Sequence, residues 1–183
     1  MKGLILLADY FEDTEALTTV DVLFRAGEKI TKAAVKNTLE VFTQCGGKVI
    51  CDELLININY QDYDYLIVPG GKASFTILNQ DSLVEEIIDY FVNNNKLVAS
   101  ICAAPHLLGR KGYFANREFT CFPGFEQYCI NGIYRRDLGV VRDDKFVSAK
   151  AMYYSIDFAL NILSFLYKDK DIESLRLSLM GEK

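Results

Sequence analysis

Four short apolar runs constrain the fold of this 183-residue chain more than any other feature. They lie at residues 3–8, 65–68, 97–101 and 146–149, and each is bounded by polar residues, glycine or proline. Runs of this length that are apolar throughout are typical of strands buried on both faces. Such strands occur in parallel sheets that helices cover, so the runs predict a fold of the α/β class.

Helical patterns separate these runs and complete the prediction. Apolar residues recur at three- and four-residue spacings in four segments, namely 16–24 (Ala16, Leu17, Val20, Leu23, Phe24), 83–91, 103–110 and 156–166 (Ile156, Ala159, Leu160, Leu163 and Leu166 facing inward). Gly27 ends the first helix, and Ser82 with Glu85 can form a capping box at the start of the second. Further short strands are expected at 30–35, 39–42 and 48–51. Strand and helix alternate, which predicts a parallel sheet with ligands at the carboxyl ends of its strands.

Composition limits the class of partner. Half of the residues are hydrophobic, so one domain spanning 1–183 can close a core without disulfides or metals. Twenty Lys and Arg against 25 Asp and Glu, with a pI near 5.0, argue against nucleic acid and anionic membranes as partners. The first apolar run is too short to span a membrane and lacks the cleavage site of a signal peptide, which predicts a cytoplasmic protein.

One of the five cysteines stands at a position that suits chemistry. No gap between cysteines gives a C-x-x-C pair or a zinc-finger spacing, so no metal site is expected. Cys102 follows a predicted strand directly, precedes a predicted helix and has small flanking residues, as in a nucleophile elbow. The N–H groups and dipole of that helix would stabilise a thiolate. The alternative interpretation is a buried cysteine that fills space at a strand end.

Several windows together resemble the DJ-one/ThiJ/PfpI superfamily, and the similarity spans nearly the whole chain. The matching segments are GLILLA (3–8), E-x-x-E (12–15) with VDVL-x-RAG (20–27), YD-x-LIVPGG (63–71), ASICAAP (99–105) and S-x-DFAL (155–160), the last resembling the DJ-one-like branch. The resemblance implies a flavodoxin-like three-layer sandwich with a mostly parallel central sheet and a nucleophile elbow. It also implies a homodimer.

The resemblance assigns roles to particular residues. Cys102 becomes the nucleophile and Glu15 the carboxyl that hydrogen-bonds to it, while the backbone N–H groups of Gly71 and Ala103 become oxyanion donors. A carboxyl kept protonated by an apolar site can share one proton with a thiolate, so Glu15 would act as general acid and base. The simpler interpretation of Glu15 is a first-turn glutamate that complements the helix dipole, a role that fits Glu12 better.

Three further residues are expected in the pocket: Gly70, Phe122 and Tyr153. Phe122 precedes Pro123 where many members of the superfamily have a histidine, so the usual third catalytic residue is absent. The single histidine, His106, is interpreted as an ordinary helix residue. The protease-like branch has a histidine directly after the cysteine; Ala103 occupies that position here, which disfavours proteolysis.

Four functions remain open. The first is an enzyme of glyoxalase or protein-deglycase type, in which Cys102 adds to a small reactive carbonyl or a glycated side chain without an external cofactor. The second is a redox sensor or chaperone-like stress protein whose Cys102 is oxidised to a sulfinic acid. A structural dimer module is the third, and an isocyanide-hydratase-like activity the fourth.

Overall fold

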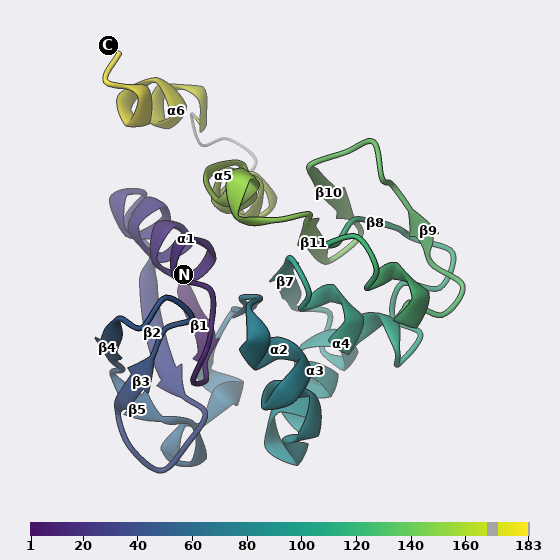
Figure 1. Cartoon of the computed structure of the whole chain (residues 1–183). Helices are drawn as coiled ribbons and strands as arrows, with labels where there is room; N and C mark the ends of the chain where they lie inside the picture. Colours follow the sequence, from purple (N-terminus) through teal and green to yellow (C-terminus); the bar gives the residue numbers. More distant parts are fainter. Residues whose placement is uncertain (168–171, 183) are drawn as a thin grey trace.

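Parallel strands and helices alternate along the chain and form three layers in the computed structural model, which describes residues 1–167 and 172–182 (Figure 1). The central sheet has seven strands in the order β10-β11-β7-β6-β1-β2-β5. All neighbouring pairs are parallel except β10 and β11. The strands are β1 (Lys2–Leu7), β2 (Lys29–Ala34), β5 (Glu53–Leu54), β6 (Tyr65–Val68), β7 (Leu97–Ile101), β10 (Val140–Asp143) and β11 (Phe146–Ala149).

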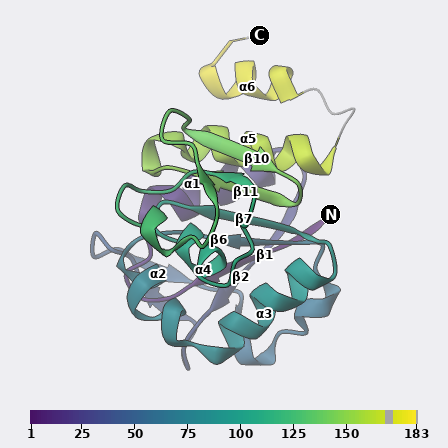
Figure 2. The same cartoon turned by 90° about the vertical axis from the view of Figure 1, so that its right-hand side faces the viewer.

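The helices cover both faces of this sheet. Figure 2 shows α5 on one side of the strands and α3 on the other. The helices are α1 (Asp13–Arg25), α2 (Lys72–Thr76), α3 (Ser82–Asn93), α4 (Pro105–Gly109), α5 (Ser155–Leu166) and α6 (Ile172–Met180). Helices α1 and α5 pack against each other, and α6 lies against α5. No helix among the described residues has the length and apolar character needed to cross a membrane.

The five long parallel strands confirm the predicted flavodoxin-like arrangement. These strands are β1, β2, β6, β7 and β11 in chain order. In the sheet they lie in the order β2, β1, β6, β7, β11, so the first two strands exchange places. The chain leaves β1 towards α1 on one face and passes from β6 to α3 on the other (Figure 1). This change of side opens a crevice outside the carboxyl ends of β1, β6 and β7. The turns that follow these three strands therefore meet at one place.

The four apolar runs form the centre of the core, as predicted. β1 from Gly3 onward, β6, β7 and β11 are buried at every position. Two short two-stranded sheets lie outside this core. They are β3 (Glu40–Phe42) with β4 (Lys48–Ile50), and β8 (Glu118–Phe119) with β9 (Ile133–Tyr134).

The N-terminus of α3 differs from the expected capping box. Asp81, not Ser82, is the capping residue, and its carboxylate accepts hydrogen bonds from the N–H groups of Leu83 (2.9 Å) and Val84 (3.1 Å). Asp81 has an extended backbone (φ −91°, ψ 115°), which places its side chain over the free N–H groups of the first turn. Ser82 is already helical and is the first residue of α3.

The apolar residues of two helices do not all face the core. On α1, which was predicted from apolar spacing alone, Ala16 and Leu23 are buried, but Leu17 and Phe24 are 40% and 73% exposed. The buried face of α1 instead includes Thr19, whose hydroxyl donates to the Glu15 carbonyl oxygen. On α5 the predicted inward position of Ile156 was wrong, because this residue is 46% exposed, whereas Ala159, Leu160 and Leu163 are buried as predicted. Apolar spacing locates a helix, but it does not distinguish a face that meets the sheet from one that meets solvent.

Candidate active site

Cys102 lies on the tight turn between β7 and α4. Its φ of 63° is in the left-handed region, which non-glycine residues rarely adopt. The conformation is held from both sides, because the Cys102 N–H donates to the Ala149 carbonyl (2.9 Å) and the Cys102 carbonyl accepts from the Phe122 N–H (2.8 Å). The turn therefore directs the half-buried side chain outward from the carboxyl edge of the sheet, as a nucleophile elbow does.

Glu15 reaches the same place from the first turn of α1. The Glu12 carboxylate accepts the Glu15 N–H at 2.7 Å and caps the helix, so the start of α1 is fixed. The Glu15 side chain is 1% exposed, and its Oε2 accepts the Gly70 N–H at 2.9 Å. The Cys102 thiol donates a second hydrogen bond to this carboxylate. The structure thus joins the predicted acid and the predicted nucleophile in one hydrogen-bonded pair.

Burial dominates the electrostatics of Glu15. It raises the pKa of this carboxyl from its ordinary 4.5 to about 7, and the charge on Glu12 raises it further, against the hydrogen bonds from Cys102 and Gly70. At neutral pH Glu15 therefore holds or releases its proton with almost equal ease. This is the property required of a general acid and base.

The expected lowering of the Cys102 pKa is not found. Burial raises the pKa of the thiol, and the charge and hydrogen bond of Glu15 raise it further, while the N–H groups of Gly71 and Ala103 lower it. The following helix, α4, has five residues, so its dipole is small. Because Cys102 and Glu15 interact strongly, their protons belong to the pair. The first proton to leave gives one negative charge, which lies mainly on the Glu15 carboxylate because its pKa is the lower of the two.

Two glycines make the close approach possible. A Cβ at Gly70 would lie 2.6 Å from both the Cys102 Cβ and the Glu15 Oε2. Gly71 has a φ of 81°, and a Cβ there would lie 2.5 Å from the backbone nitrogen of Glu12. Only residues without a side chain fit at these two positions. The sharp turn after β6 therefore presents the Gly71 N–H to the Cys102 sulfur, opposite the N–H of Ala103.

A cavity of about 340 Å³ opens above this pair. Its lining includes four predicted residues, Cys102, Gly71, Ala103 and Phe122, the last of which is 46% exposed. Two residues that were expected in the pocket lie outside the lining: Gly70, and Tyr153, which is 86% exposed. Five residues that were not predicted complete the lining: Glu12, Gln44, Lys72, Phe75 and Phe125.

His106 does not take the place of the missing loop histidine. It is 5% exposed, with Nδ1 2.7 Å from the Ala103 carbonyl oxygen and Nε2 3.2 Å from Asn79 Oδ1. Burial lowers its pKa. Its ring packs against Phe125, with centroids 5.6 Å apart, so His106 supports the cavity wall from behind. Among the described residues, no cluster of three or more His, Cys, Asp or Glu is placed to hold a metal ion.

An α/β fold of flavodoxin-like order, with a cysteine on an elbow and a buried glutamate beside it, defines the class of protein. A model of the DJ-1/PfpI family matches residues 1–165. The chain belongs to this family.

Individual relatives show what the family contains. The chain is 32% identical over 151 residues to a protein named deglycase from Pyrococcus abyssi, covering 82% of this chain and 90% of the relative. It is 28% identical over 165 residues to a glutathione-independent glyoxalase of Caenorhabditis elegans, covering 90% and 87%. The solved structure of oxidised Toxoplasma gondii DJ-1 superimposes with a TM-score of 0.91 at 25% identity, covering 98% of this chain and 97% of that one.

Proposed function

We propose that this protein is a cysteine-dependent enzyme that acts on small reactive carbonyls, of the glyoxalase or protein-deglycase type. The observation that carries the proposal is the hydrogen-bonded pair of Cys102 and Glu15 beneath an open cavity, with two N–H groups directed at the sulfur. Two relatives named deglycase and glyoxalase support it.

The arrangement of these groups supports the following route for a dicarbonyl. The Cys102 sulfur adds to the aldehyde carbon, and the N–H groups of Gly71 and Ala103 hold the oxygen that becomes negative. Glu15 protonates this oxygen, giving a hemithioacetal. Glu15 then removes the proton from the former aldehyde carbon and returns it to the neighbouring carbon, while the hydroxyl proton passes to the neighbouring carbonyl oxygen, which yields a 2-hydroxy thioester. Water hydrolyses the thioester, so the aldehyde and one water become a 2-hydroxy acid and Cys102 is regenerated.

Turnover of methylglyoxal to lactate tests the proposal. The wild type should produce lactate, whereas Cys102→Ser and Glu15→Gln should each lose at least about 100-fold in kcat/KM, because general acid–base catalysis alone contributes that much. Cys45→Ser is the matched control, since Cys45 is an exposed thiol that does not line the cavity. A wild-type rate no higher than that of Cys102→Ser rules out this activity.

A redox sensor is the second candidate, and the donors around Cys102 favour it. The N–H groups of Gly71 and Ala103, together with a protonated Glu15, could hold the oxygens of a sulfinic acid. The raised pKa of the thiol argues for slow oxidation. Peroxide treatment followed by mass spectrometry of all five cysteines decides the point: a sensor is oxidised first at Cys102, and uniform oxidation excludes it.

The five free thiols suit the reducing cytoplasm, where we propose that the protein acts.

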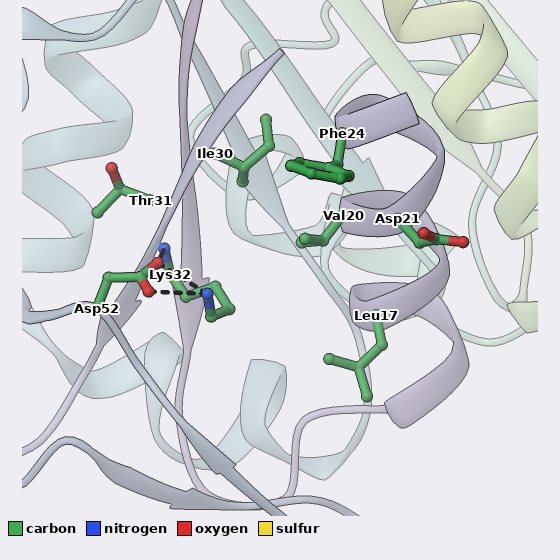
Figure 3. Close-up of a pocket in the computed structure, with 8 residues that line it drawn as sticks. All are labelled: Leu17, Val20, Asp21, Phe24, Ile30, Thr31, Lys32 and Asp52. Atoms are coloured by element: carbon green, nitrogen blue, oxygen red, sulfur yellow. Dashed lines mark hydrogen bonds and ion pairs between the residues drawn. The ribbon is translucent and has the colours of Figure 1, made fainter. Parts of the chain in front are cut away.

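We further propose a homodimer, formed through the outer face of α1 and β2. Figure 3 shows Val20 and Phe24 of α1 directed towards Ile30 of β2, with Leu17 further along the same helix; all four line one groove. Phe24 is 73% exposed, which is costly in water for so large an apolar ring. The charged residues of the groove are already paired within the chain, Asp21 with Arg25 (3.0 Å) and Lys32 with Asp52 (2.9 Å). A second copy related by a two-fold axis presents the same apolar strip, so the two strips can cover each other.

A further inference from the structure

Three phenylalanines form an aromatic wall above Cys102, and the sequence analysis assigned only one of them to the pocket. Phe122 and Phe125 lie in the loop after β8, and Phe75 lies on α2. The rings of Phe75 and Phe125 have centroids 5.5 Å apart. Phe75 is 44% exposed and Phe122 46%, so the cavity presents aromatic surface to whatever enters it.

This wall is tied to the reacting groups by backbone hydrogen bonds. The Phe122 N–H donates to the Cys102 carbonyl at 2.8 Å, and the Phe125 N–H donates to the Phe122 carbonyl at 3.1 Å. Phe75 belongs to α2, which begins directly after Gly71, one of the N–H donors to the sulfur. The backbone that bears the rings therefore keeps a fixed relation to the sulfur, so a substituent on the reacting carbon can lie against them.

The polar residues of the lining already have partners. The Glu12 carboxylate caps α1, and Gln44 Oε1 accepts the Lys72 N–H at 2.8 Å. The Lys72 ammonium lies over the Tyr10 ring, 5.3 Å from its centroid. A ligand rich in hydroxyl groups would have to compete with these contacts, whereas an apolar substituent gains contact with the aromatic wall.

We propose that this site selects carbonyl compounds with an aromatic or bulky apolar substituent over unsubstituted ones such as glyoxal, and that Phe75 and Phe122 determine this specificity. The inference rests on the proposed function for the reaction, but the selection itself is a property of the cavity. A ring contact of this kind is worth about a tenfold difference in rate between an aromatic and a small reagent.

Alkylation of Cys102 tests the selection without any carbonyl chemistry. In this reaction the sulfur displaces chloride from 2-chloroacetamide or from N-benzyl-2-chloroacetamide, forming a thioether. Mass spectrometry gives the second-order rate constant at Cys102 for each reagent, and glutathione gives the intrinsic ratio. We expect the ratio of the two rate constants at Cys102, benzyl reagent to 2-chloroacetamide, to be about tenfold higher than the same ratio for glutathione. Phe122→Ser and Phe75→Ala should each lower the preference at least about threefold, whereas Phe122→Leu should retain most of it.

Phe42→Ala is the matched control, because Phe42 is 42% exposed and lies outside the cavity lining. It should leave the preference unchanged. A wild-type ratio equal to that of glutathione, or a preference that survives both Phe122→Ser and Phe75→Ala, overturns the proposal.

A second arm separates this proposal from the proposed function. It compares kcat/KM for phenylglyoxal and glyoxal, and the wild type should favour phenylglyoxal. Turnover of both compounds without preference overturns the specificity and supports the carbonyl chemistry. No turnover of either, with the alkylation preference intact, overturns the proposed function and supports the selection by the cavity.

Discussion

The Glu15 carboxyl group is almost completely buried, and its raised pKa makes the free energy of unfolding depend on pH. In the unfolded chain its pKa is near the ordinary 4.5, and in the folded protein it is about 7. Folding therefore favours the protonated form. This contribution is fully present below pH 4.5 and is lost as the pH rises through 7.

Replacement of Glu15 by Gln should remove this dependence on pH. The free energy of unfolding of the wild type, relative to Glu15→Gln, should fall by about 3 kcal/mol between pH 4 and pH 8, because each pKa unit corresponds to about 1.4 kcal/mol. Urea denaturation of both proteins across this range measures the difference. Parallel pH profiles for the two proteins would contradict the raised pKa.

Gly70 limits how closely nucleophile and acid can approach. Because a methyl group at this position would collide with the Cys102 Cβ and the Glu15 Oε2, Gly70→Ala should force the pair apart. We expect a loss of about 1–3 kcal/mol in unfolding free energy and a fall in methylglyoxal turnover of at least about tenfold. Circular dichroism establishes that the variant is folded. A folded Gly70→Ala with wild-type turnover would show that the close pairing of Cys102 and Glu15 is unnecessary.

Among single residues, the sequence pointed to the polar pair of the candidate site but not to the aromatic residues that line the cavity. Cys102 and Glu15 stand in local patterns that a reader of the sequence can find. Phe75 and Phe125 have no such signature, because each reaches the cavity only through the packing of α2 and of the loop after β8. Phe75 lies four residues after Gly71, and that spacing was the single available clue.

The strands likewise differ in how clearly the sequence marks them. The apolar runs became β1, β6, β7 and β11. The strands β5, β8, β9 and β10 were not predicted, because they have two to four residues and are mostly half-buried, so no alternation or continuous run marks them. Neighbouring strands, and not local preference, hold these segments extended.

Capping of α3 gives a test at the scale of the element. Asp81 and Ser82 are both good N-cap residues, and the sequence alone could not choose between them. The hydrogen bonds from Leu83 and Val84 go to Asp81, so Asp81→Ala should cost about 1 kcal/mol of unfolding free energy. Ser82→Ala should cost less than about 0.5 kcal/mol. Urea denaturation of both variants measures these costs. An equal cost for the two would contradict Asp81 as the capping residue and support the capping box of Ser82.

The whole molecule presents one face that a monomer has no reason to keep apolar. Leu17, Phe24 and the half-buried Ile30 gather on the outer side of α1 and β2, and the buried side of α1 also contains apolar residues, Ala16, Val22 and Leu23. This helix is therefore partly apolar on both sides, unlike an ordinary surface helix. The proposed association with a second copy would account for this pattern.

Phe24→Asp tests the dimer. The wild type should have the mass of a dimer by light scattering at micromolar concentration, and Phe24→Asp should have that of a monomer, because a charge would be buried without a partner. Ile133→Asp, on β9, is the control: Ile133 is 49% exposed and lies outside the groove, so the mass should not change. A monomeric wild type would contradict the proposed interface.

The central claim is that Cys102 and Glu15 share one proton, and the ultraviolet absorbance of the thiolate tests it most directly. Subtracting a Cys102→Ser spectrum at each pH isolates Cys102 from the other four cysteines. In the wild type the thiolate signal should appear only well above pH 7, because the charge left on Glu15 when the pair loses its first proton raises the pKa of the thiol. Glu15→Gln carries no such charge, so its thiolate signal should rise at a lower pH. A single step with the same midpoint in both proteins would contradict a shared proton.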